Sequence, residues 1–189
     1  LFEHIDRPNV MIKIPATPDC LPAIENAIAM GINVNVTLIF SVKTYQEVAE
    51  RYLRGLERRL EAGEAIDGVA SVASFFVSRI DAMVDQQLEN NIRSGQGTFD
   101  WDRVRANDEL LGKIAIANAQ MAYETFFNIL SEDRFKTLEA NGAMPQRVLW
   151  ASTTPKNPKY PSTYYVDNLI GKHTVNTASP STLRAFMSY

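Results

Sequence analysis

Short apolar runs alternate along this chain with longer stretches in which apolar residues recur every three to four positions. The five short runs predict β-strands, and they lie near 10–14, 33–39, 69–76, 148–152 and 173–177. The periodic stretches predict helices, and they cover 21–30, 45–60, 80–88, 110–130, 134–140 and the residues after Pro180. The polar stretches at 91–101 and 154–163 predict loops. Buried strands that alternate with helices predict a parallel α/β sheet, either open and doubly wound or part of a barrel.

Length, charge and cysteine content restrict the classes of protein to which this chain can belong. With 189 residues and 22% charged residues, the chain predicts one folded domain. A net charge of −3 gives no electrostatic reason to expect binding to nucleic acid or to an anionic membrane. No apolar run approaches the roughly 18 residues of a membrane span, and the N-terminal residues lack the pattern of a signal peptide. One cysteine (Cys20) and two histidines predict a reducing, cytoplasmic setting and no cysteine- or histidine-based metal site.

Lys13 is the first candidate for chemistry, because it interrupts an otherwise apolar strand, Val10 to Ile14. In one interpretation the strand lies at the edge of the sheet and Lys13 extends into water. In the other, Lys13 lies in a dry cavity, where desolvation favours a free amine that can attack carbonyl groups. The apolar run by itself favours the edge strand.

Three further segments place polar side chains on or beside strands. With a period of two, Asn33, Asn35 and Thr37 share one strand face, and Val34, Val36 and Leu38 share the other. Ser74 and Phe76 share a face near the end of the next strand, and Arg79 follows in the first turn of a helix, where an anion could bind. Ser152 ends the fourth strand and precedes a loop that carries Lys156. Each segment has a structural alternative: a solvated strand face, a solvated arginine and an ordinary turn.

Taken together, these segments resemble the transaldolase family of Schiff-base aldolases. The resemblance covers essentially the whole chain and rests on seven segments that agree in order and spacing: Met11–Thr17, Gly31–Ser41, Val69–Arg79, Ile114–Ala119, Leu149–Thr153, Leu169–Gly171 and Thr174–Thr177. It implies an incomplete (β/α)₈ TIM barrel, in which the five strands of residues 1–189 correspond to barrel strands 4 to 8. It also implies that 91–140 is a helical insertion between the third and fourth strands of this chain.

The resemblance assigns roles to particular residues and implies that no metal or organic cofactor is needed. Lys13 is implied as the Schiff-base lysine, and Thr37 as a catalytic residue that holds the catalytic water. The implied substrate-binding residues are Asn35, Ser74, Phe76, Arg79, Ser152 and, less directly, Lys156, because many members have an arginine near that position. The implied reaction, in the pentose phosphate pathway, transfers a dihydroxyacetone unit from a ketose phosphate to an aldose phosphate. The family's proton-transfer carboxylates lie on the three βα units without a counterpart here, so this span alone is expected to have little or no activity.

Two alternatives stay open at this point. The chain could be a non-catalytic fragment or assembly module, whose exposed barrel edges are covered by a complementary chain or by self-association. It could also belong to a Schiff-base aldolase that releases dihydroxyacetone instead of transferring it.

Overall fold

A computed structural model of the chain describes residues 2–5 and 7–188 and shows an α/β fold. Its strands are β1 (Ile12–Pro15), β2 (Val34–Ile39), β3 (Ser71–Phe76), β4 (Arg147–Ala151) and β5 (Thr174–Asn176). Its helices are α1 (Phe2–Ile5), η1 (Pro18–Cys20, a 3₁₀ helix), α2 (Leu21–Ala29), α3 (Val42–Glu61), α4 (Ser78–Gly97), α5 (Trp101–Asp108), α6 (Ile114–Ser131), α7 (Asp133–Ala140), α8 (Tyr164–Leu169) and α9 (Pro180–Met187). The five strands form one sheet in chain order, which is the order expected for consecutive strands of a barrel.

The chain divides into two compact units, each assembled from separate segments. The first comprises Leu1–Phe75, Met121–Leu149 and His173–Val175, and the second comprises Phe76–Gln120, Trp150–Lys172 and Asn176–Tyr189. Within the residues that the structure describes, no helix combines the length and apolarity needed to cross a bilayer.

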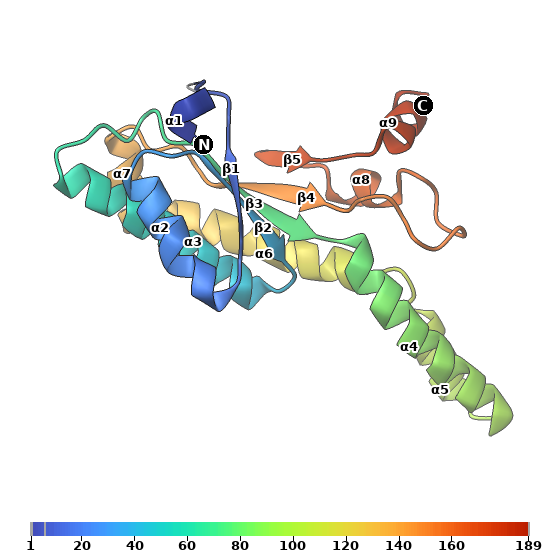
Figure 1. The fold of residues 1–189 in the computed structure, drawn as a ribbon. Helices are drawn as coiled ribbons and strands as arrows, with labels where there is room; N and C mark the ends of the chain where they lie inside the picture. The colour runs from blue at the N-terminus through green and yellow to red at the C-terminus, as the bar shows by residue number, and fades with distance from the viewer. Residues whose placement is uncertain (1, 6, 189) are drawn as a thin grey trace. The chain divides into compact units, whose positions relative to one another are not determined.

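In the first unit, helices α2 and α3 pack side by side along strands β1, β2 and β3 (Figure 1). The three strands are parallel, with Ile12 opposite Val34 and Val34 opposite Ser71. Val34, Val36 and Ile39 are fully buried, as are Ile24 and Ile28 on α2 and Val48 and Leu56 on α3. The alternating pattern of β2 and the amphipathic pattern of α3 therefore produce one shared apolar core.

A bulge changes the face that the end of β2 exposes. Val36 pairs with Ala73 and Ile39 with Phe75, so two residues of β2, Thr37 and Leu38, lie opposite one residue of β3. Leu38 has φ = +62° and is 40% exposed, whereas Ile39 is fully buried. The prediction that Leu38 shares the buried face of Val34 and Val36 is wrong, because the extra residue reverses the alternation.

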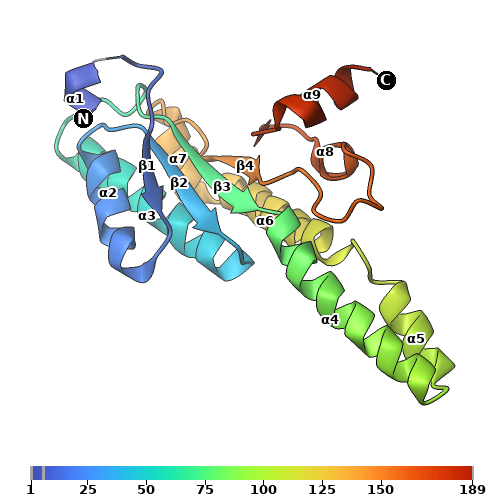
Figure 2. The same cartoon turned by 45° about the vertical axis from the view of Figure 1, so that its right-hand side comes forward.

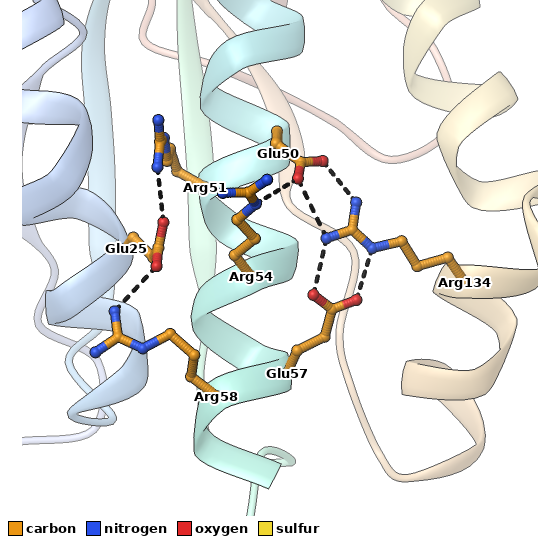
Figure 3. A network of polar contacts seen from close by, with 7 residues as sticks. All are labelled: Glu25, Glu50, Arg51, Arg54, Glu57, Arg58 and Arg134. Carbon is orange, nitrogen blue, oxygen red and sulfur yellow. Dashed lines mark hydrogen bonds and ion pairs between the residues drawn. The ribbon is translucent and has the colours of Figure 1, made fainter. Parts of the chain in front are cut away.

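Arginine–glutamate pairs join α3 to its neighbours on the side away from the strands (Figure 3). Arg134, in the first turn of α7, contacts Glu57 at 2.6 Å and also pairs with Glu50. On α2, Glu25 accepts hydrogen bonds from Arg51 at 2.9 Å and Arg58 at 3.0 Å. These pairs cross-link α2, α3 and α7 within the first unit.

The second unit contains two helices that sequence patterns did not predict. Helix α4 runs on to Gly97, and α5 begins at Trp101 and packs beside it (Figure 2), so the predicted loop at 91–101 is wrong except at 98–100. The Asp100 side chain accepts from the Arg103 backbone N–H and caps α5. The polar, glycine-containing sequence suggested a loop, but packing of the two helices against each other outweighs its low helix propensity. Helix α8 was also not predicted.

Candidate functional site

Lys13, Asn35, Thr37 and Ser74 lie on three neighbouring strands of the first unit. Lys13 on β1 is the register partner of Asn35 on β2, so their backbones lie one strand spacing apart, about 4.8 Å. The Ser74 hydroxyl on β3 donates to Asn35 Oδ1 at 2.6 Å. Ser74 is 2% exposed, whereas Asn35 and Thr37 are half-buried. The structure therefore brings the predicted lysine, amide and hydroxyls together on one sheet face.

The surroundings of Lys13 match the edge-strand interpretation within this chain. Strand β1 is the first strand of the sheet, and Lys13 is exposed. Among the residues that the structure describes, no dry cavity of the kind offered as the alternative encloses Lys13. The physical reason is that, within these residues, β1 pairs on one side only, with β2, so its other side is open to solvent.

Asn33 does not belong to this cluster, although the alternation of β2 suggested it. It precedes the strand, and its side chain is 3% exposed. Its Nδ2 donates to the Pro8 carbonyl at 2.9 Å, and its Oδ1 accepts from the Ala70 backbone N–H at 2.8 Å. Asn33 thus satisfies backbone groups at the starts of neighbouring segments, which is a structural role.

The second unit collects the residues predicted to bind phosphate around the N-terminus of α4. Ser78 begins the helix, its backbone N–H donates to the Ser152 carbonyl at 3.0 Å, and its hydroxyl lies 3.0 Å from that of Ser152. Ser152 adopts φ = +57°, a left-handed conformation that costs a non-glycine residue about 1–2 kcal/mol. The N-terminus of a 20-residue helix favours negative charge, and two hydroxyls and a strained turn lie beside it.

Two cations accompany this helix terminus. The guanidinium of Arg79 is exposed and lies 5.0 Å from the centre of the Phe76 ring, a cation–π arrangement that restrains the long side chain. Lys156 is exposed and lines a cleft of about 260 Å³ together with Ser78. The structure therefore groups Arg79 with Phe76, and Ser152 and Lys156 with Ser78, in the second unit.

Sequence reasoning missed Ser78 and the acidic wall of this cleft. Asp81 and Asp85, one turn apart on α4, are buried and line the cleft with Tyr160 and Tyr165. Desolvation by burial raises the pKa of Asp81, against hydrogen bonds from the Ala115 N–H and Tyr165 that favour its ionised form, and nearby Asp85 raises it further. The four-residue spacing of the two aspartates indicates a shared helix face, but their tyrosine partners lie about 75 to 84 positions away.

Metal binding receives no support from side-chain clustering. Among residues 2–5 and 7–188, no three His, Cys, Asp or Glu side chains gather closely enough to hold a metal ion. The two histidines, His4 and His173, lie on α1 and just before β5.

Comparison with known proteins identifies close relatives. A family model described as transaldolase/fructose-6-phosphate aldolase matches residues 1–189. The transaldolase of Trichodesmium erythraeum is 50% identical over 185 residues, covering 97% of this chain and 48% of that protein. The transaldolases of Saccharopolyspora erythraea and Mycobacterium tuberculosis are 49% and 47% identical, covering 98% of this chain and 47% of each relative. The chain therefore spans about half the length of the curated relatives it matches.

Proposed function

Because the chain belongs to the transaldolase/fructose-6-phosphate aldolase family, we propose that it carries the Schiff-base half of a transaldolase. The observation that carries the proposal is the pairing of Lys13 with Asn35, with Ser74 donating to the amide of Asn35. The fold is an α/β sheet of five consecutive strands, as expected for part of the family's TIM barrel. The proposed substrates are a ketose phosphate as donor and an aldose phosphate as acceptor, in the cytoplasm.

The proposed chemistry begins at the Lys13 amine. Its nitrogen attacks the C2 ketone of the ketose phosphate, and loss of water gives an imine. A base removes the proton of the C4 hydroxyl, the C3–C4 bond breaks, and its electrons enter the imine to give an enamine on Lys13. The shorter aldose phosphate leaves, and C3 of the enamine attacks the aldehyde of the acceptor. Addition of water to the resulting imine then frees the product and the amine.

Asn35, Ser74 and Thr37 are proposed to orient the three-carbon unit and the water. Because the Ser74 hydroxyl donates to Asn35 Oδ1, the amide is held with its NH₂ group available to donate to a substrate hydroxyl. Thr37 lies two positions further along the same strand and is proposed to hold the water that adds to the imine. Arg79, Ser152 and Lys156, with the α4 N-terminus, are proposed to bind the phosphate group, and Phe76 to provide an apolar wall.

The proposed base is a group outside this chain, not one of the chain's own carboxylates. Glu25 is committed to Arg51 and Arg58, and Asp81 accepts from Ala115 and Tyr165 in the second unit. Asp19 lies on η1, not on a strand. Positioned acid–base catalysis contributes about 10²- to 10⁴-fold to rate, so this chain alone is expected to turn over slowly or not at all. A complementary chain that pairs with β1 is one proposed source of the base.

The test is a chimaera in which this chain replaces the matching span of the Trichodesmium erythraeum transaldolase. Incubation with fructose 6-phosphate and borohydride should add a reduced three-carbon adduct to Lys13, located by peptide mass mapping. Lys13→Arg should abolish trapping, because a guanidinium is a poor nucleophile. Lys43→Arg, at an exposed position of α3, is the matched control and should leave trapping unchanged.

Each outcome bears on a different part of the proposal. Trapping that persists in Lys13→Arg contradicts the assignment of the Schiff-base lysine. Accumulation of free dihydroxyacetone without transfer to erythrose 4-phosphate contradicts the transaldolase proposal in favour of an aldolase. Trapping in the chimaera but not in the 189-residue chain supports the need for additional groups.

A further inference from the structure

The loop between β4 and α8, residues 152–163, is attached to α4 at its first end. The Ser78 N–H donates to the Ser152 carbonyl, and the two serine hydroxyls lie 3.0 Å apart. The preceding residues are tied in the same way, because the Val77 N–H donates to the Ala151 carbonyl at 3.0 Å. The start of the loop is therefore fixed against the first turn of α4.

Two tyrosine–aspartate hydrogen bonds attach the far end of the loop, at Tyr160, and the first turn of α8, at Tyr165, to the same helix. The Tyr160 hydroxyl donates to Asp85 Oδ2 at 2.7 Å, and the Tyr165 hydroxyl donates to Asp81 Oδ2 at 2.8 Å. Asp81 and Asp85 are 1% and 6% exposed; the Tyr165–Asp81 bond is buried, and the Tyr160–Asp85 bond is partly buried.

The second oxygen of each aspartate is also occupied. Asp81 Oδ1 accepts from the Ala115 backbone N–H at 2.7 Å, and Asp85 Oδ1 accepts from the Gly112 N–H at 2.9 Å. Gly112 has φ = +73°, and a Cβ there would lie 2.7 Å from Cζ of Tyr160, so the turn and the ring pack in direct contact. These backbone hydrogen bonds hold the two aspartate side chains in place, and the aspartates in turn fix the positions of the tyrosine hydroxyls.

Lys156 lies between the two attachments and lines the same cleft as Ser78, Asp81 and Asp85. An exposed lysine on a free loop would sample many positions, at the cost of losing that freedom on binding. A loop tied at both ends confines the ammonium group to the neighbourhood of the α4 N-terminus. Confinement before binding reduces the entropy lost when an anion is bound.

We propose that Tyr160 and Tyr165, held by Asp85 and Asp81, are positioning residues that place Lys156 for binding of a phosphate group at the N-terminus of α4. This inference rests on the proposed function, because it names the residues that set the phosphate affinity of that site. None of the four needs to touch the ligand. Their effect is transmitted through the position of the loop.

The experiment titrates inorganic phosphate into the 189-residue chain and follows the backbone amide signals of Ser78, Arg79 and Ser152 by NMR. Tyr160→Phe and Tyr165→Phe each remove one hydroxyl and keep the ring. Each is expected to weaken phosphate binding about three- to tenfold, which is the worth of one intramolecular hydrogen bond. Tyr52→Phe is the matched control: it removes the hydrogen bond from the Tyr52 hydroxyl to the Met144 carbonyl in the first unit, and phosphate affinity should not change.

A double-mutant cycle separates positioning from general loss of structure. In the Lys156→Met background, Tyr160→Phe should weaken binding by less than about twofold, because its effect passes through Lys156. Equal losses with and without Lys156, or losses matched by Tyr52→Phe, overturn the inference and leave the phosphate site standing. If the unsubstituted chain shows no phosphate-dependent shift at these amides, the phosphate site itself is refuted.

Discussion

Replacement of Gly55 by alanine tests how closely α2 and α3 approach each other. Gly55 is buried in the middle of α3, where an alanine normally stabilises a helix. A Cβ at this position would lie 2.6 Å from Cβ of Ile28, 2.7 Å from its Cγ2 and 2.9 Å from the Glu25 carbonyl oxygen. Neither a branched Cβ nor a backbone carbonyl can rotate away, so the two helices must separate.

Whether Gly55→Ala stabilises or destabilises the protein depends on the balance between the gain in helix propensity and the cost of overpacking. Alanine gains about 1 kcal/mol over glycine in a helix interior. Overpacking of a rigid contact costs about 1–3 kcal/mol, and the upper part of that range applies because the Ile28 Cβ and the Glu25 carbonyl oxygen cannot rotate away. The expected net effect is a loss of about 2 kcal/mol in the free energy of unfolding.

The measurement is urea unfolding followed by circular dichroism, with Gly97→Ala as the matched control. Gly97 ends α4, and a Cβ there meets nothing within 4 Å, so its alanine variant should be as stable as the original chain or slightly more stable. If Gly55→Ala is as stable as Gly97→Ala, the close approach of α2 and α3 is refuted.

Two further predictions concern charged side chains. Arg134→Met removes the pairs with Glu50 and Glu57 and should cost about 1 kcal/mol in urea unfolding, a small value because these side chains are about a third exposed; an undiminished cost in 1 M salt would contradict an electrostatic origin. Burial acts to raise the pKa of Glu50, but hydrogen bonds from Arg134 and Arg54 hold that pKa below its usual range. The contribution of the ionised Glu50 to the free energy of unfolding should therefore be present at neutral pH and disappear as the pH falls through the lowered pKa. Arg79→Ala should weaken phosphate binding to the chain by about tenfold, whereas Arg93→Ala, on the same helix but paired with Asn90, should not, and equal losses would contradict a role for Arg79 in the site.

Periodicity along the sequence was sufficient for the strands and for helices α3 and α6, because their burial is decided within each element. The apolar stripe of α3 and the alternation of Val34 and Val36 predicted the faces that are buried. The residues 91–108 were harder, because α5 and the end of α4 have few buried side chains and are stabilised by each other. No local pattern reports such a pairing.

The sequence predicted which strand residues share a sheet face near Lys13, but not the environment of those residues. The register of β1 and β2 depends on both strands, yet the position of Lys13 and Asn35 near the middle of each run made their pairing a reasonable expectation. The exposure of Lys13 depends on how many strands flank β1, which the strand's own sequence does not contain. The contacts of Asp81 and Asp85 with Tyr160 and Tyr165 depend on chain folding over long separations.

The bulge in β2 shows which residue of that strand is dispensable for the core. Without Leu38, Val34, Val36 and Ile39 would alternate without interruption, and the same three side chains would stay buried. Leu38 therefore adds a left-handed backbone and an exposed apolar side chain, both unfavourable for stability, and contributes nothing to the buried face. What it does supply is spacing: Thr37 and Leu38 both lie opposite Ser74, so the strand offers one more side chain at that level than a regular ladder allows. The difference in the free energy of unfolding between a variant that lacks Leu38 and the original chain would measure how much stability the strand loses to the geometry of its exposed face.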